Sequence, residues 1–313
     1  MISTKRETIR IGVDLGGTKI EVIALTSTGE EVFRHRMVAP RGSYHATIRA
    51  IQDLVQLADR ITGSHGTVGV GIPGAMSNRN GLIKNANSTW IIGYPLLRDL
   101  RNALGRPVKI SNDANCFAVS EAVDGAGEGC EVVFGVILGT GVGAGITFSG
   151  RPLEGANSIA GEWGHNPLPW STEDERPGDK CYCGRSGCIE TFLSGPALER
   201  AHSRVSGENL SSVNVAKRAA DGDRAAQRSM ATYEERLAKS LAHVINILDP
   251  DVIILGGGIS NISRLYENVP SIWGQYVFSD RIDTPLLSPV HGDSSGVRGA
   301  AWLWPSATID GET

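Results

Sequence analysis

The sequence lacks the features of a membrane, secreted or nucleic-acid-binding protein. No apolar run reaches the roughly 18 residues of a membrane-spanning helix, because glycines and a threonine interrupt the longest candidate, residues 132–146. Neither charge dominates: 30 Lys and Arg residues stand against 34 Asp and Glu residues, which argues against nucleic acid or a membrane surface as the main partner. Residues 1–10 show no apolar stretch of the secretory type. We therefore expect a cytoplasmic protein that handles a small ligand.

Two widespread nucleotide-binding motifs are also missing. The sequence has no G-x-x-x-x-G-K-[ST] loop and none of the protein-kinase signatures. One G-x-G-x-x-G string occurs at residues 69–74, but Pro73 stands in its turn and no helical pattern follows. A dinucleotide fold is therefore not predicted, and a nucleotide site is expected at other turns.

Glycine, by contrast, is abundant, with 39 residues, and three glycine turns each follow an apolar run. Glycine lets backbone N–H groups converge on an anion without a side chain in the way. Each turn alone is better explained by a tight hairpin. The three together favour a cradle for nucleotide phosphates, formed by Gly16, Gly17 and Thr18, by Gly139, Thr140 and Gly141, and by Gly256, Gly257 and Gly258.

The order of apolar patterns predicts alternating strands and helices. Apolar residues recur at helical spacing in 45–61 and 233–248, whereas 68–72 and 252–255 are short apolar runs typical of strands. Residues 134–150 also repeat the strand, glycine turn and strand of residues 11–27, although two unrelated hairpins would give the same pattern. We expect an α/β protein with two similar halves.

Three of the five cysteines, Cys181, Cys183 and Cys188, fall within eight residues. In a reducing compartment such a cluster is more often a metal site than a disulfide framework. With His165 they fill a tetrahedral zinc shell that has no open position, which predicts a structural ion. Unligated core cysteines are the alternative.

Asp113 is the best candidate for a general base. It follows a predicted strand, where a carboxylate could accept a proton from a substrate hydroxyl group. The same position suits a helix N-cap, and both interpretations stay open. Glu162 and Glu190 flank the predicted zinc ligands, and by themselves they read as surface acids or as partners of those ligands.

Together these motifs resemble the ROK family of sugar kinases and repressors, over about residues 11–305. The strings at 71–74, 85–90, 162–170 and 291–296 look like those of the bacterial fructokinase or manno(fructo)kinase group. The motifs that carry the likeness are Asp14-x-Gly-Gly-Thr-Lys19, Asn112-Asp113, Gly139-Thr-Gly141, Glu162-x-Gly-His165, the Cys-x-Cys-x-x-x-x-Cys-x-Glu run from Cys181 to Glu190, and Gly256-Gly-Gly258.

The resemblance implies a fold and an assembly. The fold is α/β, with two ribonuclease-H-like domains of the actin/hexokinase/Hsp70 superfamily flanking a cleft. Residues 1–115, with 297–313 returning, would form an N-terminal domain that binds phosphate and sugar. Residues 116–296 would form a C-terminal domain with the zinc loop and the adenosine-binding region. A homodimer is also implied.

The resemblance further implies which residues meet each ligand. His165 would bind zinc through one ring nitrogen and face the sugar with the other. The residues expected at ATP are Asp14, Gly16, Gly17, Thr18, Lys19, Gly139, Thr140, Gly141, Gly256, Gly257 and Gly258, and Asp14 is also expected at magnesium. The residues expected at the sugar are Gly74, Asn87, Asn112, Asp113, Glu162, His165 and Glu190. The residues expected at zinc are His165, Cys181, Cys183 and Cys188.

The implied activity is phosphorylation of the 6-hydroxyl group of D-fructose, with D-mannose as a second substrate, Mg–ATP as donor and Asp113 as general base. A glucokinase or an N-acetylhexosamine kinase would share nearly every motif. A sugar-responsive repressor of the family would need a helix-turn-helix, for which the thirteen residues before Asp14 are too few. A chaperone ATPase of the same fold would leave the zinc cluster without a role.

Overall fold

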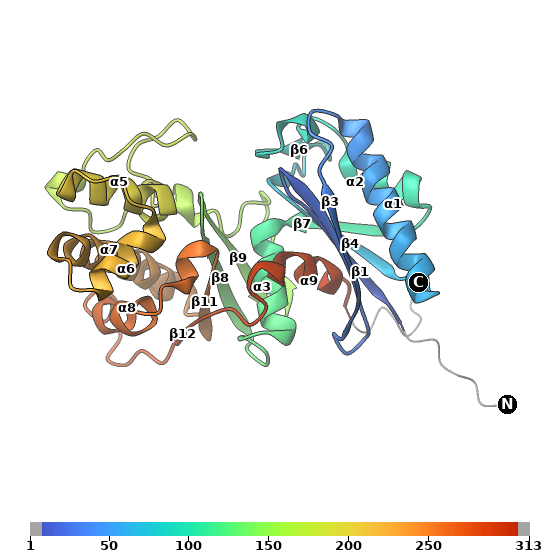
Figure 1. Ribbon diagram of the computed structural model, residues 1–313. Coiled ribbons are helices and arrows are strands. Elements are labelled where there is room, and N and C mark those ends of the chain that lie inside the picture. The colour runs from blue at the N-terminus through green and yellow to red at the C-terminus, as the bar shows by residue number, and fades with distance from the viewer. Residues whose placement is uncertain (1–7, 306–313) are drawn as a thin grey trace. The chain divides into compact units, whose positions relative to one another are not determined.

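The computed structural model describes residues 8–305. The described chain forms two compact units (Figure 1), of which the first comprises residues 8–129, 145–160 and 293–305, and the second residues 130–144 and 161–292. The outermost residues of the expected N-terminal domain, 1–7 and 306–313, lie outside the described residues. The chain also forms two five-stranded sheets.

The first sheet has the strand order β3-β2-β1-β4-β7. Strand β2 pairs antiparallel with both β1 and β3, which confirms the expected strand, glycine turn and strand near the N-terminus. The other two strands run parallel to β1. The strands are β1 (Arg10–Leu15), β2 (Lys19–Leu25), β3 (Glu31–Val38), β4 (Thr67–Ile72) and β7 (Val108–Asn112).

The second sheet has the order β10-β9-β8-β11-β12 and repeats the first sheet position by position. Strand β8 pairs parallel with β11, and β11 pairs parallel with β12. Strands β1, β4 and β7 of the first sheet have the same arrangement. This repetition supports the internal duplication predicted from residues 11–27 and 134–150. The strands are β8 (Val132–Leu138), β9 (Val142–Phe148), β10 (Arg151–Pro152), β11 (Val252–Gly256) and β12 (Leu286–Leu287).

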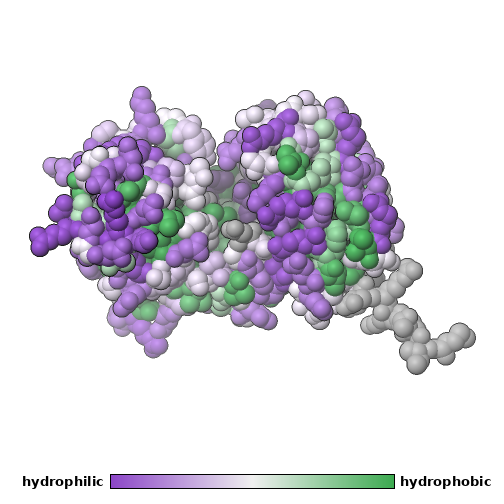
Figure 2. Space-filling model, in the orientation of Figure 1, coloured by the Kyte–Doolittle hydropathy of each residue, from purple (hydrophilic) through white to green (hydrophobic). Residues whose placement is uncertain are grey.

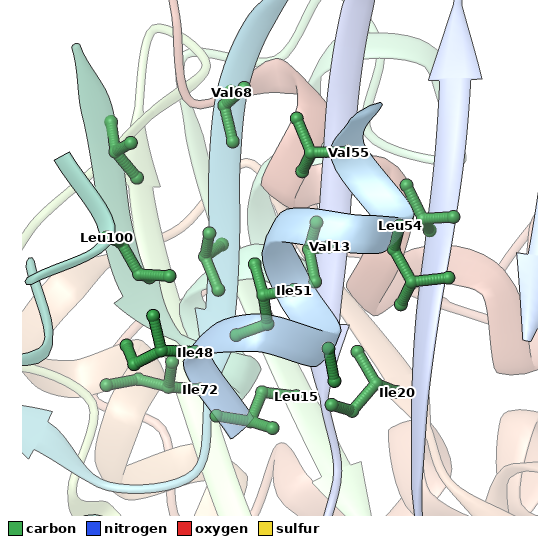
Figure 3. Packing of buried hydrophobic residues seen from close by; sticks show 14 of the residues in the cluster. Val13, Leu15, Ile20, Ile48, Ile51, Leu54, Val55, Val68, Ile72 and Leu100 are labelled. Atoms are coloured by element: carbon green, nitrogen blue, oxygen red, sulfur yellow. The ribbon is translucent and has the colours of Figure 1, made fainter. Parts of the chain in front are cut away.

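Helices α1 (Tyr44–Thr62) and α2 (Leu96–Leu104) cover one face of the first sheet. Figure 3 shows Ile48, Ile51 and Leu54 of α1 packed against buried sheet residues such as Val13. Ser43 caps the start of α1, because its side chain accepts a hydrogen bond from the Ala46 N–H group at 3.3 Å. The helical periodicity over 45–61 is therefore confirmed.

Helices α3 (Asp113–Asp124) and α9 (Ser295–Trp302) cover the other face of this sheet. Two strand glycines allow the close approach of α9. A Cβ atom on Gly12 would lie 2.1 Å from the Val297 carbonyl oxygen, and one on Gly69 would lie 1.9 Å from that of Ala300. The glycines inside these strands thus serve packing.

The observed division of the chain differs from the expected one. Helix α3 belongs to the first unit although the expected boundary falls at residue 115, and residues 145–160 and 293–296 belong to that unit as well. The reason is the contact between α3 and α9, in which a Cβ atom on Gly299 would lie 1.6 Å from the Cys116 carbonyl oxygen. Such close packing of backbones holds α3 in the first unit.

The second unit is mostly helical outside its strands. Its longest helix, α7, begins nine residues before the expected start at Tyr233, because Asp223 caps it by accepting a hydrogen bond from the Ala226 N–H group at 2.8 Å. The helices are α4 (Glu190–Leu193), α5 (Gly195–Ser206), α6 (Ser212–Ala220), α7 (Arg224–Leu248) and α8 (Leu265–Trp273).

No helix within residues 8–305 is long and apolar enough to cross a membrane. On the face drawn in Figure 2, hydrophilic residues predominate and hydrophobic residues form small separate groups.

Candidate active site

The first glycine turn joins β1 to β2 in the first unit. The Gly16 N–H group donates a hydrogen bond to the Lys19 carbonyl oxygen at 3.0 Å and closes the turn. Arg41 fixes its outer side, since Nε donates to the Gly17 carbonyl oxygen at 2.9 Å. Gly17, Thr18 and Lys19 are exposed. The turn thus presents backbone N–H groups, a hydroxyl group and an ammonium group to solvent, as a phosphate site requires.

Asp14 stands at the end of β1, just before this turn. Burial, together with the negative charges of Asp113 and Glu21, raises the pKa of its carboxyl group to about 7, against the opposing charges of Lys19 and Arg36. A carboxylate held in such surroundings gains from a nearby cation. Asp14 therefore fits the expected position beside the magnesium ion of Mg–ATP.

Asp113 is the first residue of α3, and the helix cap is its neighbour Asn112. The Asn112 Oδ1 atom accepts a hydrogen bond from the Ala114 N–H group at 2.9 Å. Asp113 is exposed, and its Oδ1 atom accepts from the same N–H group at 2.8 Å. The positive end of the helix dipole favours the ionised carboxylate. Asn112 thus performs the capping, and Asp113 offers a carboxylate at the helix end.

The segment before α2 supplies further polar groups to the first unit. Asn112 Nδ2 donates to the Gly74 carbonyl oxygen at 2.9 Å, so two of the expected sugar residues contact each other. Gly74 has φ +79°, and a Cβ atom there would lie 2.5 Å from the Lys84 carbonyl oxygen, which excludes other residues. Asn87 is exposed. Its neighbour Ser88 is fully buried, and its Oγ atom has no hydrogen-bond partner within residues 8–305.

The second and third glycine turns follow the neighbouring strands β8 and β11 of the second unit. The Gly139 N–H group donates to the Gly141 carbonyl oxygen at 3.0 Å, while Thr140 is exposed. Gly257 has φ +78°, and a Cβ atom there would lie 2.5 Å from the Leu138 carbonyl oxygen. A Cβ atom on Gly258 would meet nothing within 4 Å. The two turns therefore lie side by side and leave open space next to exposed backbone.

The Glu-x-Gly-His motif lies on a short 3-10 helix, Trp163–His165, in the same unit. Trp163 is buried and packs edge-on against Phe134 of β8, with ring centroids 5.7 Å apart. Gly164 lies against β9, where a Cβ atom would stand 2.3 Å from the Val142 carbonyl oxygen. These two contacts anchor the motif, and they leave Glu162 exposed and His165 half-buried beside it.

The four predicted zinc ligands come together in the second unit. One ligand atom from each of His165, Cys181, Cys183 and Cys188 lies within 4.8 Å of the others. The Cys183 and Cys188 sulfur atoms are 3.6 Å apart, and the Cys181 sulfur atom is 3.5 Å from His165 Nδ1. A tetrahedral zinc site with ordinary bond lengths has ligand–ligand edges of about 3.5–3.8 Å. The cluster therefore fits zinc and can hold it through His165 Nδ1.

The surroundings of these thiols change their pKa values, and a bound zinc ion would act on the same groups. Burial raises the pKa of the Cys188 thiol to about 12 and raises that of Cys181, whereas a hydrogen bond from the backbone of Arg185 lowers that of Cys183. Thiolates are the form that binds zinc. A bound cation would therefore stabilise the charged state that burial disfavours.

Glu190 joins the metal loop to the second glycine turn. Its Oε2 atom accepts a hydrogen bond from the Val142 N–H group at 2.9 Å, and its Oε1 atom lies 3.9 Å from the Cys181 sulfur atom. A Cβ atom on Gly141 would lie 2.7 Å from Oε2, so glycine makes room for the carboxylate. Both Glu190 oxygens thus already contact protein groups.

Tyr182 is a residue that the sequence analysis missed. Its hydroxyl oxygen lies 2.9 Å from His165 Nε2, the nitrogen that was expected to face the sugar. Partial desolvation, together with the charges of the Glu190 and Glu162 carboxylates, raises the pKa of Tyr182 to about 12. Its position between Cys181 and Cys183 in the sequence could have indicated that it lies beside the metal cluster.

The expected site residues divide between the two units. Those in the first unit are Asp14, Gly16, Gly17, Thr18, Lys19, Gly74, Asn87, Asn112 and Asp113; those in the second are Gly139, Thr140, Gly141, Glu162, His165, Cys181, Cys183, Cys188, Glu190, Gly256, Gly257 and Gly258.

The chain is similar to known proteins along almost its whole length. The ROK family model matches residues 10–307. An N-acetyl-D-glucosamine kinase of Photobacterium profundum is 40% identical over 296 residues, which cover 93% of this chain and 98% of that protein. A ROK hexokinase of Thermus thermophilus has a TM-score of 0.86 at 29% identity and covers 97% of this chain and 100% of its own. A ROK glucokinase of Streptomyces griseus, solved with glucose and AMPPNP, has a TM-score of 0.72 at 26% identity and covers 94% of this chain and 98% of its own.

These similarities confirm the expected fold class, a mixed α/β structure with the two sheet domains of the actin/hexokinase/Hsp70 superfamily. They do not support the expected placement near the fructokinases. Relatives at 40% and 38% identity, from Photobacterium profundum and Pectobacterium carotovorum, are named N-acetyl-D-glucosamine kinases.

Proposed function

The chain belongs to the ROK family, and from that premise we propose that it is an ATP-dependent kinase of the 6-hydroxyl group of a hexose. The observation that carries the proposal is the arrangement in the first unit. The exposed Asp113 carboxylate stands at the start of α3, close enough to Asp14 to raise its pKa, and Asp14 adjoins the first glycine turn. A base and a phosphate cradle thus belong to one rigid sheet and its helices.

The reaction is a direct phosphoryl transfer. The hexose O6 atom attacks the γ-phosphorus atom of ATP, the Asp113 carboxylate accepts the O6 proton, and the bond to the β-phosphate oxygen breaks to release ADP. The N–H groups and hydroxyl group of the first turn, with Lys19, hold the phosphates. Magnesium, which arrives with ATP, neutralises phosphate charge. Positioning and charge stabilisation supply most of the acceleration.

In this proposal the zinc cluster orients the sugar-binding groups without chemistry of its own. Four protein ligands leave zinc no open position for water or substrate. The ligand loop carries His165, and it adjoins Glu190, whose carboxylate contacts both the loop and β9. A structural ion would thus keep the sugar side of the second unit in place. The expected homodimer stays a prediction.

For the identity of the sugar, the relatives favour N-acetyl-D-glucosamine. They are named N-acetyl-D-glucosamine kinases at 37–40% identity and span nearly the whole chain. D-fructose is the second candidate, because the strings at 85–90 and 162–170 resemble the manno(fructo)kinase group. Both sugars present a hydroxyl group at C6, so the mechanism above is the same for either.

A coupled assay of ADP release tests the proposal. The protein receives Mg–ATP and, one at a time, N-acetyl-D-glucosamine, D-fructose, D-mannose, D-glucose and N-acetyl-D-mannosamine. The highest kcat/KM for N-acetyl-D-glucosamine would support the first candidate, and the highest for D-fructose the second. No turnover with any of the five, in a folded protein with its metal bound, would refute the kinase proposal.

A further inference from the structure

Arg41 lies beside the first glycine turn, and the mechanism above gives it no role. It belongs to the short segment of residues 39–43 that leads from β3 into α1. Its side chain is exposed, yet its Nε atom donates a hydrogen bond to the Gly17 carbonyl oxygen at 2.9 Å. Within residues 8–305 no carboxylate oxygen lies within 4 Å of its guanidinium group. The arginine is therefore spent on a backbone oxygen of the turn and not on an ion pair.

The segment that carries Arg41 is itself held against the turn. The Ala39 N–H group donates to the Thr18 carbonyl oxygen at 2.9 Å, and the Arg41 N–H group donates to the Ala39 carbonyl oxygen at 2.9 Å. Ser43, which caps α1, donates its N–H group to the Pro40 carbonyl oxygen at 3.4 Å. The arginine thus reaches the turn from a backbone that is already fixed.

The hydrogen bond from Arg41 decides where the next N–H group points. The Gly17–Thr18 peptide bond is trans, and a trans peptide directs its carbonyl and N–H groups to opposite sides. Since Gly17 directs its carbonyl group toward Arg41, the Thr18 N–H group points to the other side of the turn. That N–H group donates no hydrogen bond to the described part of the chain. It is therefore available to a ligand.

The space beside the turn can accept such a ligand. A Cβ atom on Gly17 would meet, among described residues outside the turn, only the Ser88 Oγ atom within 4 Å, at a distance of 3.8 Å. Thr18 and Lys19 are exposed. Lys19 also lacks a carboxylate oxygen within 4 Å of its ammonium group in residues 8–305. With Arg41 and Lys19 the turn thus carries two positive charges without an acidic partner, which favours a polyanion.

A guanidinium group on a carbonyl oxygen also polarises the peptide. A hydrogen bond from a charged donor is about twice as strong as one between neutral groups. Hydrogen bonds that follow one another through a peptide strengthen each other, because each polarises the next. Arg41 on the Gly17 carbonyl oxygen therefore makes the Thr18 N–H group a stronger donor.

We propose that Arg41 is a positioning residue for the phosphates of ATP: it orients and polarises the Gly17–Thr18 peptide, and the Thr18 N–H group donates to a phosphate oxygen. The inference rests on the proposed kinase function, and it adds a residue from outside the glycine motif to the phosphate site. Arg41 acts through the peptide, because the peptide separates it from the Thr18 N–H group. All three residues belong to the first unit.

The test is Arg41→Ala, which removes the guanidinium group from an exposed position. The matched control is Arg49→Ala, since Arg49 is an exposed arginine on α1 of the same unit that makes no hydrogen bond to the turn in the described chain. We expect a KM for Mg–ATP about 5- to 10-fold higher in Arg41→Ala than in the control, because the Thr18 N–H group loses its orientation and polarisation. The KM for the best sugar and the Tm should stay near those of the control.

Two further measurements separate the role of the charge from that of the side chain's bulk. Calorimetric titration with Mg–ATP in the absence of sugar should show the same loss of affinity in Arg41→Ala. The Arg41→Lys variant keeps the positive charge but lacks the Nε donor, so its KM for Mg–ATP should lie between those of the parent protein and Arg41→Ala. A KM in Arg41→Lys at least as high as in Arg41→Ala would contradict the role of the charge.

An unchanged KM for Mg–ATP in Arg41→Ala would overturn the inference and leave the kinase function intact. A lower Tm together with an equal rise in the KM values for ATP and sugar would also overturn it, because Arg41 would then serve the fold and not the nucleotide. If the parent protein phosphorylates none of the sugars, the proposed function fails, and the calorimetric titration with Mg–ATP still decides the role of Arg41.

Discussion

The raised pKa of Asp14 predicts that this residue destabilises the protein at neutral pH. In the folded protein burial raises the pKa of its carboxyl group from 3.8 to about 7. The sign follows from linkage. Between these two values the folded state binds more protons than the unfolded state, so the free energy of unfolding falls as pH rises through this window. The Asp14→Asn substitution removes the charge and should therefore stabilise the protein at pH values above this window.

The magnitude follows from the two pKa values. A shift of about three units corresponds to about 4 kcal/mol above pH 7, because each unit is worth about 1.4 kcal/mol. Asp14 is half-buried, and solvent screening reduces this figure. We therefore expect the advantage of the Asp14→Asn variant to grow by about 2 kcal/mol between pH 5 and pH 8.

Urea unfolding without magnesium or nucleotide measures this difference, at several pH values for both proteins. The Asp113→Asn variant is the control, because the Asp113 charge is a smaller cause of the shift than burial. It should give a smaller advantage in the same direction. An Asp14→Asn variant less stable than the parent at pH 8, or an advantage that does not change with pH, would refute the reasoning.

Three further predictions concern the base, the metal and a glycine. Asp113→Asn should lower kcat about 10²-fold or more while calorimetry shows sugar affinity largely retained; near-normal turnover would end its assignment as the base. Metal analysis should find about one zinc per chain, and Cys183→Ser should lose it, lower Tm and raise the sugar KM, whereas Cys130→Ser should do none of these; a stable, active protein without zinc would contradict the cluster. Gly257→Ala should cost about 1–3 kcal/mol in urea unfolding, because its φ is +78° and a Cβ atom would lie 2.5 Å from the Leu138 carbonyl oxygen; an unchanged midpoint would show that the turn relaxes.

Local sequence patterns predicted the parts of the fold and site that short segments determine. Helix α1 follows from helical periodicity, and the metal cluster follows from three cysteines within eight residues. The hairpin of β1 and β2 follows from a glycine turn between two apolar runs. In each case the residues that decide the structure are close in sequence.

The remaining features depend on contacts between distant residues. Helix α3 joins the first unit because Cys116 meets Gly299, and no local pattern records that contact. The hydroxyl group of Tyr182 meets the ring of His165, seventeen residues earlier in the chain, and no local pattern predicts that contact. The choice among hexoses likewise depends on side chains of several loops, which the motifs shared by the family do not distinguish.

Phosphorus and proton NMR of the reaction product tests the central claim most directly. The protein is incubated with Mg–ATP and its best sugar, and the site of phosphorylation is read from the coupling between phosphorus and the sugar protons. Phosphorus should couple to the two protons on C6, and Asp113→Asn should yield little of this product. A sugar phosphorylated at another oxygen, or ADP formed without any sugar phosphate, would contradict it.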